Sequence, residues 1–257
     1  MKNVEILGVR VHATTMPEAL ERIAAFVAAG PSHQIVTVNP EFVMTARRNL
    51  AFRQVLNQAD LSLPDGIGLV WAARLLHGRG ALPERVAGVD VVERLAEVGA
   101  RRGWRLYLLG AAEGVAARAA QALTRRYPGL AVVGTCAGSP TEAEAAGLIA
   151  RVRAAQPDIL LVAYGAPAQD LWIARHRHEL QVPVAMGVGG AFDFIAGVTR
   201  RAPRWMQKAG LEWLHRLIQQ PWRWRRMTAL PRFAALVIWQ RLSRSSPPIS
   251  PAEADHA

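Results

Sequence analysis

The feature that most constrains the fold of this chain is an alternation of strand-like and helix-like segments over its first two-thirds. Short runs rich in β-branched and aliphatic residues recur at 35–38, 105–109, 131–133, 159–163 and 184–188. Ala- and Arg-rich stretches with helical spacing lie between them, and helices are predicted over 113–126 and 141–155. Strands that alternate with helices pair in parallel, with helices on both faces of the sheet. The sequence therefore predicts an α/β protein with a Rossmann-like, mainly parallel sheet.

Positive charge is concentrated near the C-terminal end. The 257 residues carry a net charge of +11, yet eleven Lys and Arg and a single acid, Glu212, lie between Arg200 and Arg244. Five of the eight Trp lie in the same segment. A basic, Trp-rich segment attached to a nearly neutral body suits an anionic lipid surface, a diphosphate or a nucleic acid.

This shift in composition divides the chain into three predicted parts. We expect an α/β core over residues 1–199, a small helical appendage over 200–242 and a disordered tail over 243–257. Pro221 and Pro231 are expected to break the appendage into short helices.

Several classes of protein are excluded by what the sequence lacks. It has one cysteine, Cys136, and no zinc-ligand spacing, Walker A motif, Gly-x-Ser-x-Gly motif or Asp-x-Asp pair. We therefore expect no metal and no cofactor. No signal peptide and no transmembrane helix are predicted, which favours a reducing, cytoplasmic location. His176 and His178 are expected on an exposed helix.

Two short motifs carry polar side chains suited to a site. Thr37 and Asn39 follow a predicted strand and precede a helix, where ligands of open α/β sheets bind. Asn39 can equally be a simple helix cap. Asp65 lies in a Pro-Asp-Gly sequence and is a candidate general base, although the same sequence is typical of a plain turn.

Three further segments offer groups for binding phosphate. The Gly- and Pro-rich loop 77–88 contains Arg85, whose guanidinium can bind a diphosphate in a bidentate manner, or can be an ordinary surface group. The segment 187–193 contains Gly187, Gly189 and Gly190, whose backbone N–H groups suit oxyanions. The turn 164–172 also follows a predicted strand. The last two segments can also be ordinary strand-to-helix turns.

Taken together, the sequences of these motifs and their order along the chain resemble those of the WecG/TagA/CpsF family of glycosyltransferases. The resemblance covers roughly residues 5–240, and its matching stretches are 38–43, 59–68, 84–90, 165–173, 187–193 and 201–207. It implies a metal-independent, inverting transferase that moves a sugar from a UDP-sugar to an undecaprenyl-diphosphate-linked sugar. It also implies a peripheral position on the inner face of the cytoplasmic membrane, an anionic surface as partner and no nucleic acid.

The resemblance implies roles for particular residues. Asp65 corresponds to the proposed base, and Arg85 is the second catalytic candidate. The resemblance assigns substrate binding to Thr37, Asn39 and Gln169. The further substrate-binding candidates of this sequence are Gly187, Gly189, Gly190, Asp193, Arg204, Arg216 and Arg223.

Two other functions stay open on sequence alone. The basic appendage is compatible with a nucleic-acid-binding α/β protein, although Trp and apolar residues at helical spacing fit a membrane surface better. A nicotinamide-dependent oxidoreductase is the enzymatic alternative, but the Gly110–Gly114 turn lacks the full glycine fingerprint. The sequence does not determine whether the donated sugar is of the N-acetylmannosamine type or the glucose type. It also does not determine the oligomeric state, and a homo-oligomer is compatible with it.

Overall fold

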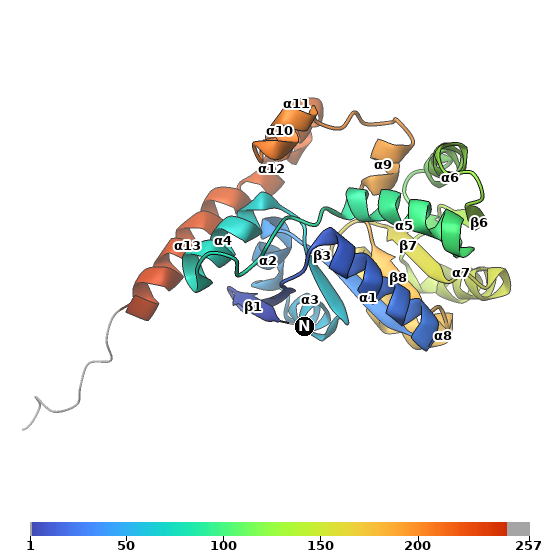
Figure 1. Cartoon of the computed structure of the whole chain (residues 1–257), viewed down its shortest axis with the longest axis horizontal. Coiled ribbons are helices and arrows are strands. Elements are labelled where there is room, and N and C mark those ends of the chain that lie inside the picture. The colour runs from blue at the N-terminus through green and yellow to red at the C-terminus, as the bar shows by residue number, and fades with distance from the viewer. Residues whose placement is uncertain (1, 246–257) are drawn as a thin grey trace, which may run out of the picture.

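The computed structural model describes residues 2–245 (Figure 1). Within this part, six parallel strands form one sheet in the order β4-β3-β8-β7-β5-β6, and two antiparallel strands form a separate hairpin, β1-β2. The strands are β1 (Asn3–Ile6), β2 (Val9–His12), β3 (His33–Val38), β4 (Leu61–Pro64), β5 (Arg105–Gly110), β6 (Ala131–Cys136), β7 (Ile159–Ala163) and β8 (Val184–Gly187). The predicted α/β, Rossmann-like fold class is confirmed.

Helices connect the strands and cover both faces of the sheet. Those of the first part of the chain are α1 (Met16–Ala29), α2 (Pro40–Ala46), α3 (Leu50–Gln58), α4 (Ile67–His77), α5 (Gly88–Arg102), α6 (Val115–Arg126), α7 (Glu142–Ala155), α8 (Ala168–Leu180) and α9 (Ala191–Ile195). The basic segment forms α10 (Arg204–Lys208), α11 (Glu212–Gln219), the 3-10 turn η1 (Pro221–Arg223), α12 (Trp224–Met227) and α13 (Ala229–Ser245).

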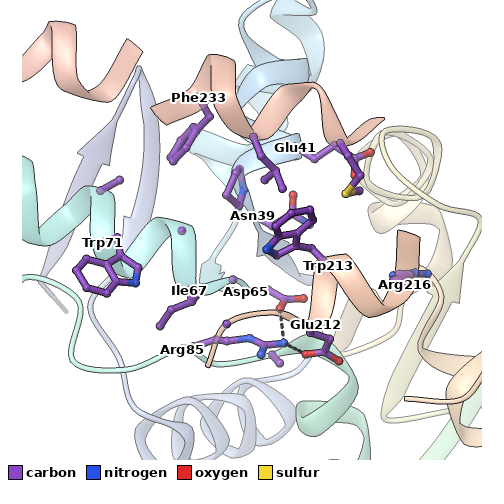
Figure 2. A pocket seen from close by; sticks show the side chains of 18 of the residues that line it. Asn39, Glu41, Asp65, Ile67, Trp71, Arg85, Glu212, Trp213, Arg216 and Phe233 are labelled. Atoms are coloured by element: carbon purple, nitrogen blue, oxygen red, sulfur yellow. Dashed lines mark hydrogen bonds and ion pairs between the residues drawn. The ribbon is translucent and has the colours of Figure 1, made fainter. Parts of the chain in front are cut away.

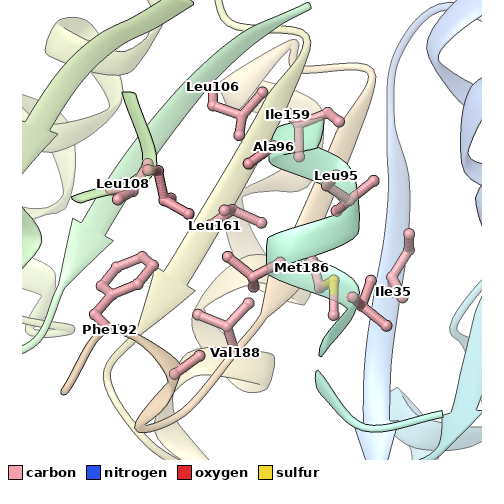
Figure 3. Packing of buried hydrophobic residues seen from close by; sticks show 14 of the residues in the cluster. Ile35, Leu95, Ala96, Leu106, Leu108, Ile159, Leu161, Met186, Val188 and Phe192 are labelled. Atoms are coloured by element: carbon pink, nitrogen blue, oxygen red, sulfur yellow. The ribbon is translucent and has the colours of Figure 1, made fainter. Parts of the chain in front are cut away.

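The core has two layers because successive residues of each strand point to opposite faces. Leu106 and Leu108 of β5 pack in one layer with α1, α5, α6 and α9, and Figure 3 shows this layer around Leu95 and Phe192. Tyr107 and Leu109 pack in the other layer with α7 and α8. Burial on both faces explains why these strands are continuous apolar runs in the sequence.

The last helix completes the core. α13 packs against α2 and α4 (Figure 1), and its Phe233 and Val237 are buried in the same cluster as Phe42 and Leu69. Helix formation in the appendage is thus confirmed, although the boundary proposed at residue 199 stays a prediction. The tail from residue 246 lies outside the described residues.

Three local expectations were wrong or incomplete. Pro231 does not break a helix, because it lies in the first turn of α13, where a missing N–H costs little. His176 is buried rather than exposed, since its ring packs 5.2 Å from that of Trp172. The β1-β2 hairpin was not predicted, because its turn places Leu7 at a φ of 50° instead of using an Asn-Gly pair.

Candidate active site

The polar motifs meet at the carboxyl ends of three neighbouring strands. β4, β3 and β8 are adjacent in the sheet, so the segments that follow them lie side by side. The Thr37 hydroxyl donates to the Gly187 carbonyl oxygen over 3.3 Å, which ties β3 to β8 directly. Ligands of open α/β sheets bind at this edge. A cavity of about 630 Å³ opens here, and Asn39, Asp65 and Gly190 line it (Figure 2).

Asn39 caps a helix and also lines the cavity. Its side-chain oxygen accepts a hydrogen bond from the Phe42 N–H at 2.9 Å, so it caps α2. The same side chain lines the cavity. The cap fixes its orientation, and a capping amide can still present its remaining N–H groups to a ligand.

Asp65 is held at the end of β4 by backbone contacts. Its N–H donates to the Val38 carbonyl oxygen at 2.7 Å, and its carboxylate accepts from the Gly88 N–H at 3.2 Å. The next residue, Gly66, has a φ of 140°, which a residue with a side chain rarely adopts, so the sharp turn requires glycine.

The environment of Asp65 favours a base that is ready to accept a proton. Burial of the carboxylate raises the pKa of Asp65 above its ordinary value, while Arg85 and the Gly88 N–H oppose this shift. Glu212 and Asp90 act in the same direction as burial. The side chain is still 26% exposed, and this exposed part faces the cavity. A raised pKa brings a carboxylate closer to the range in which general bases work.

Arg85 belongs to a chain of alternating charges that joins the core to the appendage. Its guanidinium lies 2.6 Å from Glu212 and 3.8 Å from Asp65 (Figure 2). Glu212 also pairs with Arg201 at 3.0 Å, and Arg201 forms a two-pronged contact with Asp90. Burial would raise the pKa of Glu212, but Arg85 and Arg201 outweigh it and hold this pKa below its ordinary value.

Arg216 brings a cation from the appendage into the cavity. Its guanidinium packs over the ring of Phe194 at 5.1 Å and lies so close to the Gly190 backbone that a Cβ there would collide with it. Its buried Nε has no hydrogen-bond partner. Burial, and then the nearby Arg226, lowers the pKa of Arg216, while Asp193, Glu41 and Asp65 oppose this shift. An anionic ligand would supply the missing partner.

Arg226 is the second cation of the appendage at the cavity. It contacts Glu41 of α2 at 2.5 Å, and both side chains line the cavity. The Arg226 side chain is 41% exposed, so it is not enclosed by the protein. It was not singled out from the sequence, because nothing local distinguishes it from Arg225 beside it.

Gln169 lies beneath the site instead of lining the cavity. It is fully buried, and its side-chain oxygen accepts from the N–H groups of Gly165 at 3.1 Å and Gly189 at 2.9 Å. It thereby holds the turns after β7 and β8 together. The neighbouring Asp170 is also fully buried, and burial raises its pKa to about 7.

Several of the predicted substrate-binding residues do not line the cavity. Gly187 lies against Gln169 and Asp170, Gly189 has a φ of 53° in the turn, and Asp193 lies beside Gly190 at the start of α9. None of these three lines the cavity. Arg204 is exposed at the start of α10, also outside the lining. The side chain of Arg223 lies outside what the structure describes. Over residues 2–245 no group of three or more His, Cys, Asp or Glu side chains is arranged to hold a metal ion.

Glu212 and Arg201 are functional candidates that sequence reasoning missed. The signal was present for Glu212, because it is the lone acid in an otherwise basic segment. A carboxylate retained among so many cations is expected to pair with some of them, but only the fold shows that one partner is Arg85.

A parallel α/β sheet with a carboxylate and several cations around a cavity at its carboxyl edge is the arrangement of an open α/β enzyme that binds its ligands at this edge. The chain belongs to the WecG/TagA/CpsF family of glycosyl transferases, whose family model matches residues 4–247. It is therefore a glycosyltransferase, as the sequence motifs predicted.

Named relatives agree with this family. The chain is 36% identical over 213 residues, covering 82% of this chain and 81% of the relative, to an N-acetylglucosaminyldiphosphoundecaprenol N-acetyl-beta-D-mannosaminyltransferase of Bacillus subtilis. It is 32% identical over 232 residues, covering 90% of each chain, to a protein of the same name from Staphylococcus aureus. Among the described helices, none is long and apolar enough to cross a membrane.

Proposed function

We propose that this enzyme transfers N-acetylmannosamine from a UDP-sugar donor to N-acetylglucosamine carried on undecaprenyl diphosphate, with inversion at the anomeric carbon and without a metal ion. The names of the Bacillus and Staphylococcus relatives support the sugar and the acceptor. The product would be a lipid-linked disaccharide for a cell-surface polymer.

The observation that carries this proposal is that Asp65 faces the cavity and is only loosely paired with Arg85. Its carboxylate opens into the cavity from a rigid turn, while Arg85, the cation nearest to it in the ion-pair chain, is engaged by Glu212. A carboxylate tightly paired with arginine would be a poor base. The shared Arg85 leaves Asp65 able to accept a proton.

The chemical step needs one proton transfer and one exchange of bonds. The acceptor hydroxyl gives its proton to Asp65 as its oxygen forms a bond to the anomeric carbon of the donor. The bond from that carbon to the diphosphate oxygen breaks on the opposite face, and UDP leaves with the electron pair. The protonated Asp65 then returns its proton to solvent.

The negative charge that develops on the leaving diphosphate needs fixed cations and donors. Arg216 can stabilise this charge because its Nε lacks a partner and its guanidinium lies against Gly190 at the start of α9. Preorganised donors of this kind typically contribute about 10²–10³-fold to the rate. We propose that Arg216 binds the donor diphosphate.

The surface of the appendage supports a peripheral position on the inner face of the cytoplasmic membrane. Trp205, Trp222 and Trp224 are exposed there among cationic side chains. Tryptophan and arginine both suit the headgroup region of a bilayer. A lipid-linked acceptor would be presented at this surface.

A transfer assay tests the proposed function. The purified chain is incubated with undecaprenyl-diphosphate-linked N-acetylglucosamine and a panel of UDP-sugars, and the lipid product is analysed by mass and by anomeric configuration. We expect one added N-acetylhexosamine from UDP-N-acetylmannosamine, with a β linkage. Transfer of glucose alone would contradict the donor assignment, and no transfer from any donor would contradict the function.

A further inference from the structure

The cavity that begins at Asp65 extends well beyond the polar groups that the chemistry needs. Its far part runs between two helices, α4 and α13. It is lined by side chains that we call the α4–α13 lane: Trp71, Leu75, Leu230, Ala234 and Ile238. Figure 2 shows Trp71 on one side of Asp65 and Arg216 on the other.

The lane residues are regularly spaced along the two helices. Trp71 and Leu75 are one helical turn apart on α4, and Leu230, Ala234 and Ile238 follow at four-residue steps on α13, so each set forms one face. On α13 this stripe is about 12 Å long, from the rise of a helix. Phe233 and Val237 beside it are buried in the core, which fixes α13 in place.

Exposure distinguishes the lane from ordinary core. Trp71 is 64% exposed and Ile238 is 52% exposed, although both line the same cavity as Asp65. Large apolar side chains left open to water beside a site indicate a surface that a ligand covers. The covering group must be apolar, because none of the five lane residues carries a charge.

The polar end of the same cavity identifies the kind of ligand. Arg226 lies three residues before α13 begins, contacts Glu41 at 2.5 Å and lines the cavity with a side chain that is 41% exposed. An anionic group at Arg226 would therefore continue directly into the lane. A ligand with a charged head joined to an apolar chain matches this order, whereas an apolar peptide would leave the cations unused.

We propose that the α4–α13 lane binds the first prenyl units of the lipid acceptor, while Arg226 binds its diphosphate. This inference rests on the proposed acceptor of the enzyme. The lane would hold the apolar chain within the protein, so that the sugar at the other end of the diphosphate reaches Asp65.

Substitutions in the lane test the proposal with acceptors of different tail length. Trp71→Ala and Leu75→Ser are assayed with a long-prenyl acceptor in detergent micelles and with a water-soluble acceptor that has a short alkyl tail. We expect the KM for the long acceptor to rise about tenfold in each variant, as the loss of buried apolar area predicts. Turnover of the short acceptor and hydrolysis of the donor should match the wild type.

Two controls separate the lane from general surface effects. Leu50→Ser removes another exposed leucine, at the start of α3 and outside the cavity, and should leave both acceptors unaffected. Trp239 is 66% exposed, adjoins Ile238 and does not line the cavity. A loss with Trp239→Ala equal to that with Trp71→Ala would assign the effect to surface contact and overturn the lane.

The remaining outcomes are also decisive. A wild-type KM for the long acceptor in Trp71→Ala and Leu75→Ser, with unchanged melting temperatures, would overturn the proposal. An equal loss on the short acceptor would mean that the lane does not bind the lipid tail. If the wild-type enzyme transferred sugar to neither acceptor, the proposed function itself would fail, which is a distinct result.

Discussion

The guanidinium of Arg85 lies 2.6 Å from the carboxylate of Glu212, a closer approach than its 3.8 Å to Asp65. The core loop and the appendage therefore meet at an ion pair beside the candidate base. Arg201 pairs with Glu212 from the other side. Glu212, nearly 150 positions away in the sequence, acts to raise the pKa of Asp65, so under the proposed mechanism we expect docking of the appendage to influence the chemistry.

Glu212→Gln should shift the pH dependence of transfer. Glu212 helps to raise the pKa of Asp65 and Arg85 helps to lower it, so removal of the negative charge lowers this pKa. Because the carboxylate is the active form, activity is present above the pKa and lost as pH falls through it. We expect the acid limb of the kcat/KM profile to move to lower pH, and kcat on the plateau to fall because the base is weaker.

The control for this prediction is Glu113→Gln, which removes one exposed carboxylate remote from the cavity. Its pH profile should overlay that of the wild type. An unchanged acid limb in Glu212→Gln, in a protein whose melting temperature shows that it is folded, would mean that the ion pair does not tune Asp65.

Arg216→Ala should slow the chemical step even when membrane docking is irrelevant. With a water-soluble acceptor we expect kcat to fall by about 10²–10³-fold, the typical loss for one donor to a developing anion. Arg232→Ala removes the same charge from an exposed position of the same appendage, outside the cavity. Equal turnover by these two variants would show that the appendage acts only as an anchor.

Gln169→Ala should lower the stability of the protein, because Gln169 holds two backbone turns beneath the site. The side-chain oxygen accepts from two backbone N–H groups, and its loss leaves both of these partly buried groups without that acceptor. We expect the free energy of unfolding, measured by urea denaturation, to fall by about 2–4 kcal/mol. Gln121→Ala on the exposed face of α6 is the matched control. Wild-type stability together with an increased KM for the donor would instead indicate direct contact with substrate.

Transfer should persist in the presence of EDTA. The proposed mechanism assigns the charge of the leaving diphosphate to Arg216 and backbone donors rather than to a bridging cation. Initial rates with and without chelator measure this directly. A loss of activity that Mg²⁺ or Mn²⁺ restores would show that a metal ion carries this charge.

The sheet was predictable because its strands are apolar runs that alternate with helical patterns. β3, β5, β7 and β8 were found within a few residues of their observed bounds. β4 was missed, because Leu61–Pro64 is only four residues long and the Pro-Asp-Gly turn that follows it dominated the interpretation. Short strands depend on pairing with a neighbour, here β3, which the local sequence does not encode.

The site was predictable only in part, because the packing of elements distant in the sequence is not encoded locally. The position of Asn39 after the predicted strand 35–38 located it at the correct edge of the sheet. Asp65 was identified from its Pro-Asp-Gly sequence and the family resemblance, without a predicted strand before it. Gln169 was expected to bind substrate but is enclosed under the glycine turn, because side-chain direction on α8 depends on how that helix packs. The partners of Arg85 could not be predicted, since they are set by how the appendage folds back onto the core.

Comparison of Asp65→Asn with the wild type tests the central claim most directly. The amide has nearly the same shape but cannot accept the proton, and general-base catalysis contributes about 10²–10⁴-fold. With the lipid-linked acceptor and UDP-N-acetylmannosamine, we predict that kcat falls by at least the lower of these factors while the melting temperature and donor affinity stay unchanged. Turnover close to that of the wild type would contradict the assignment of Asp65 as the base.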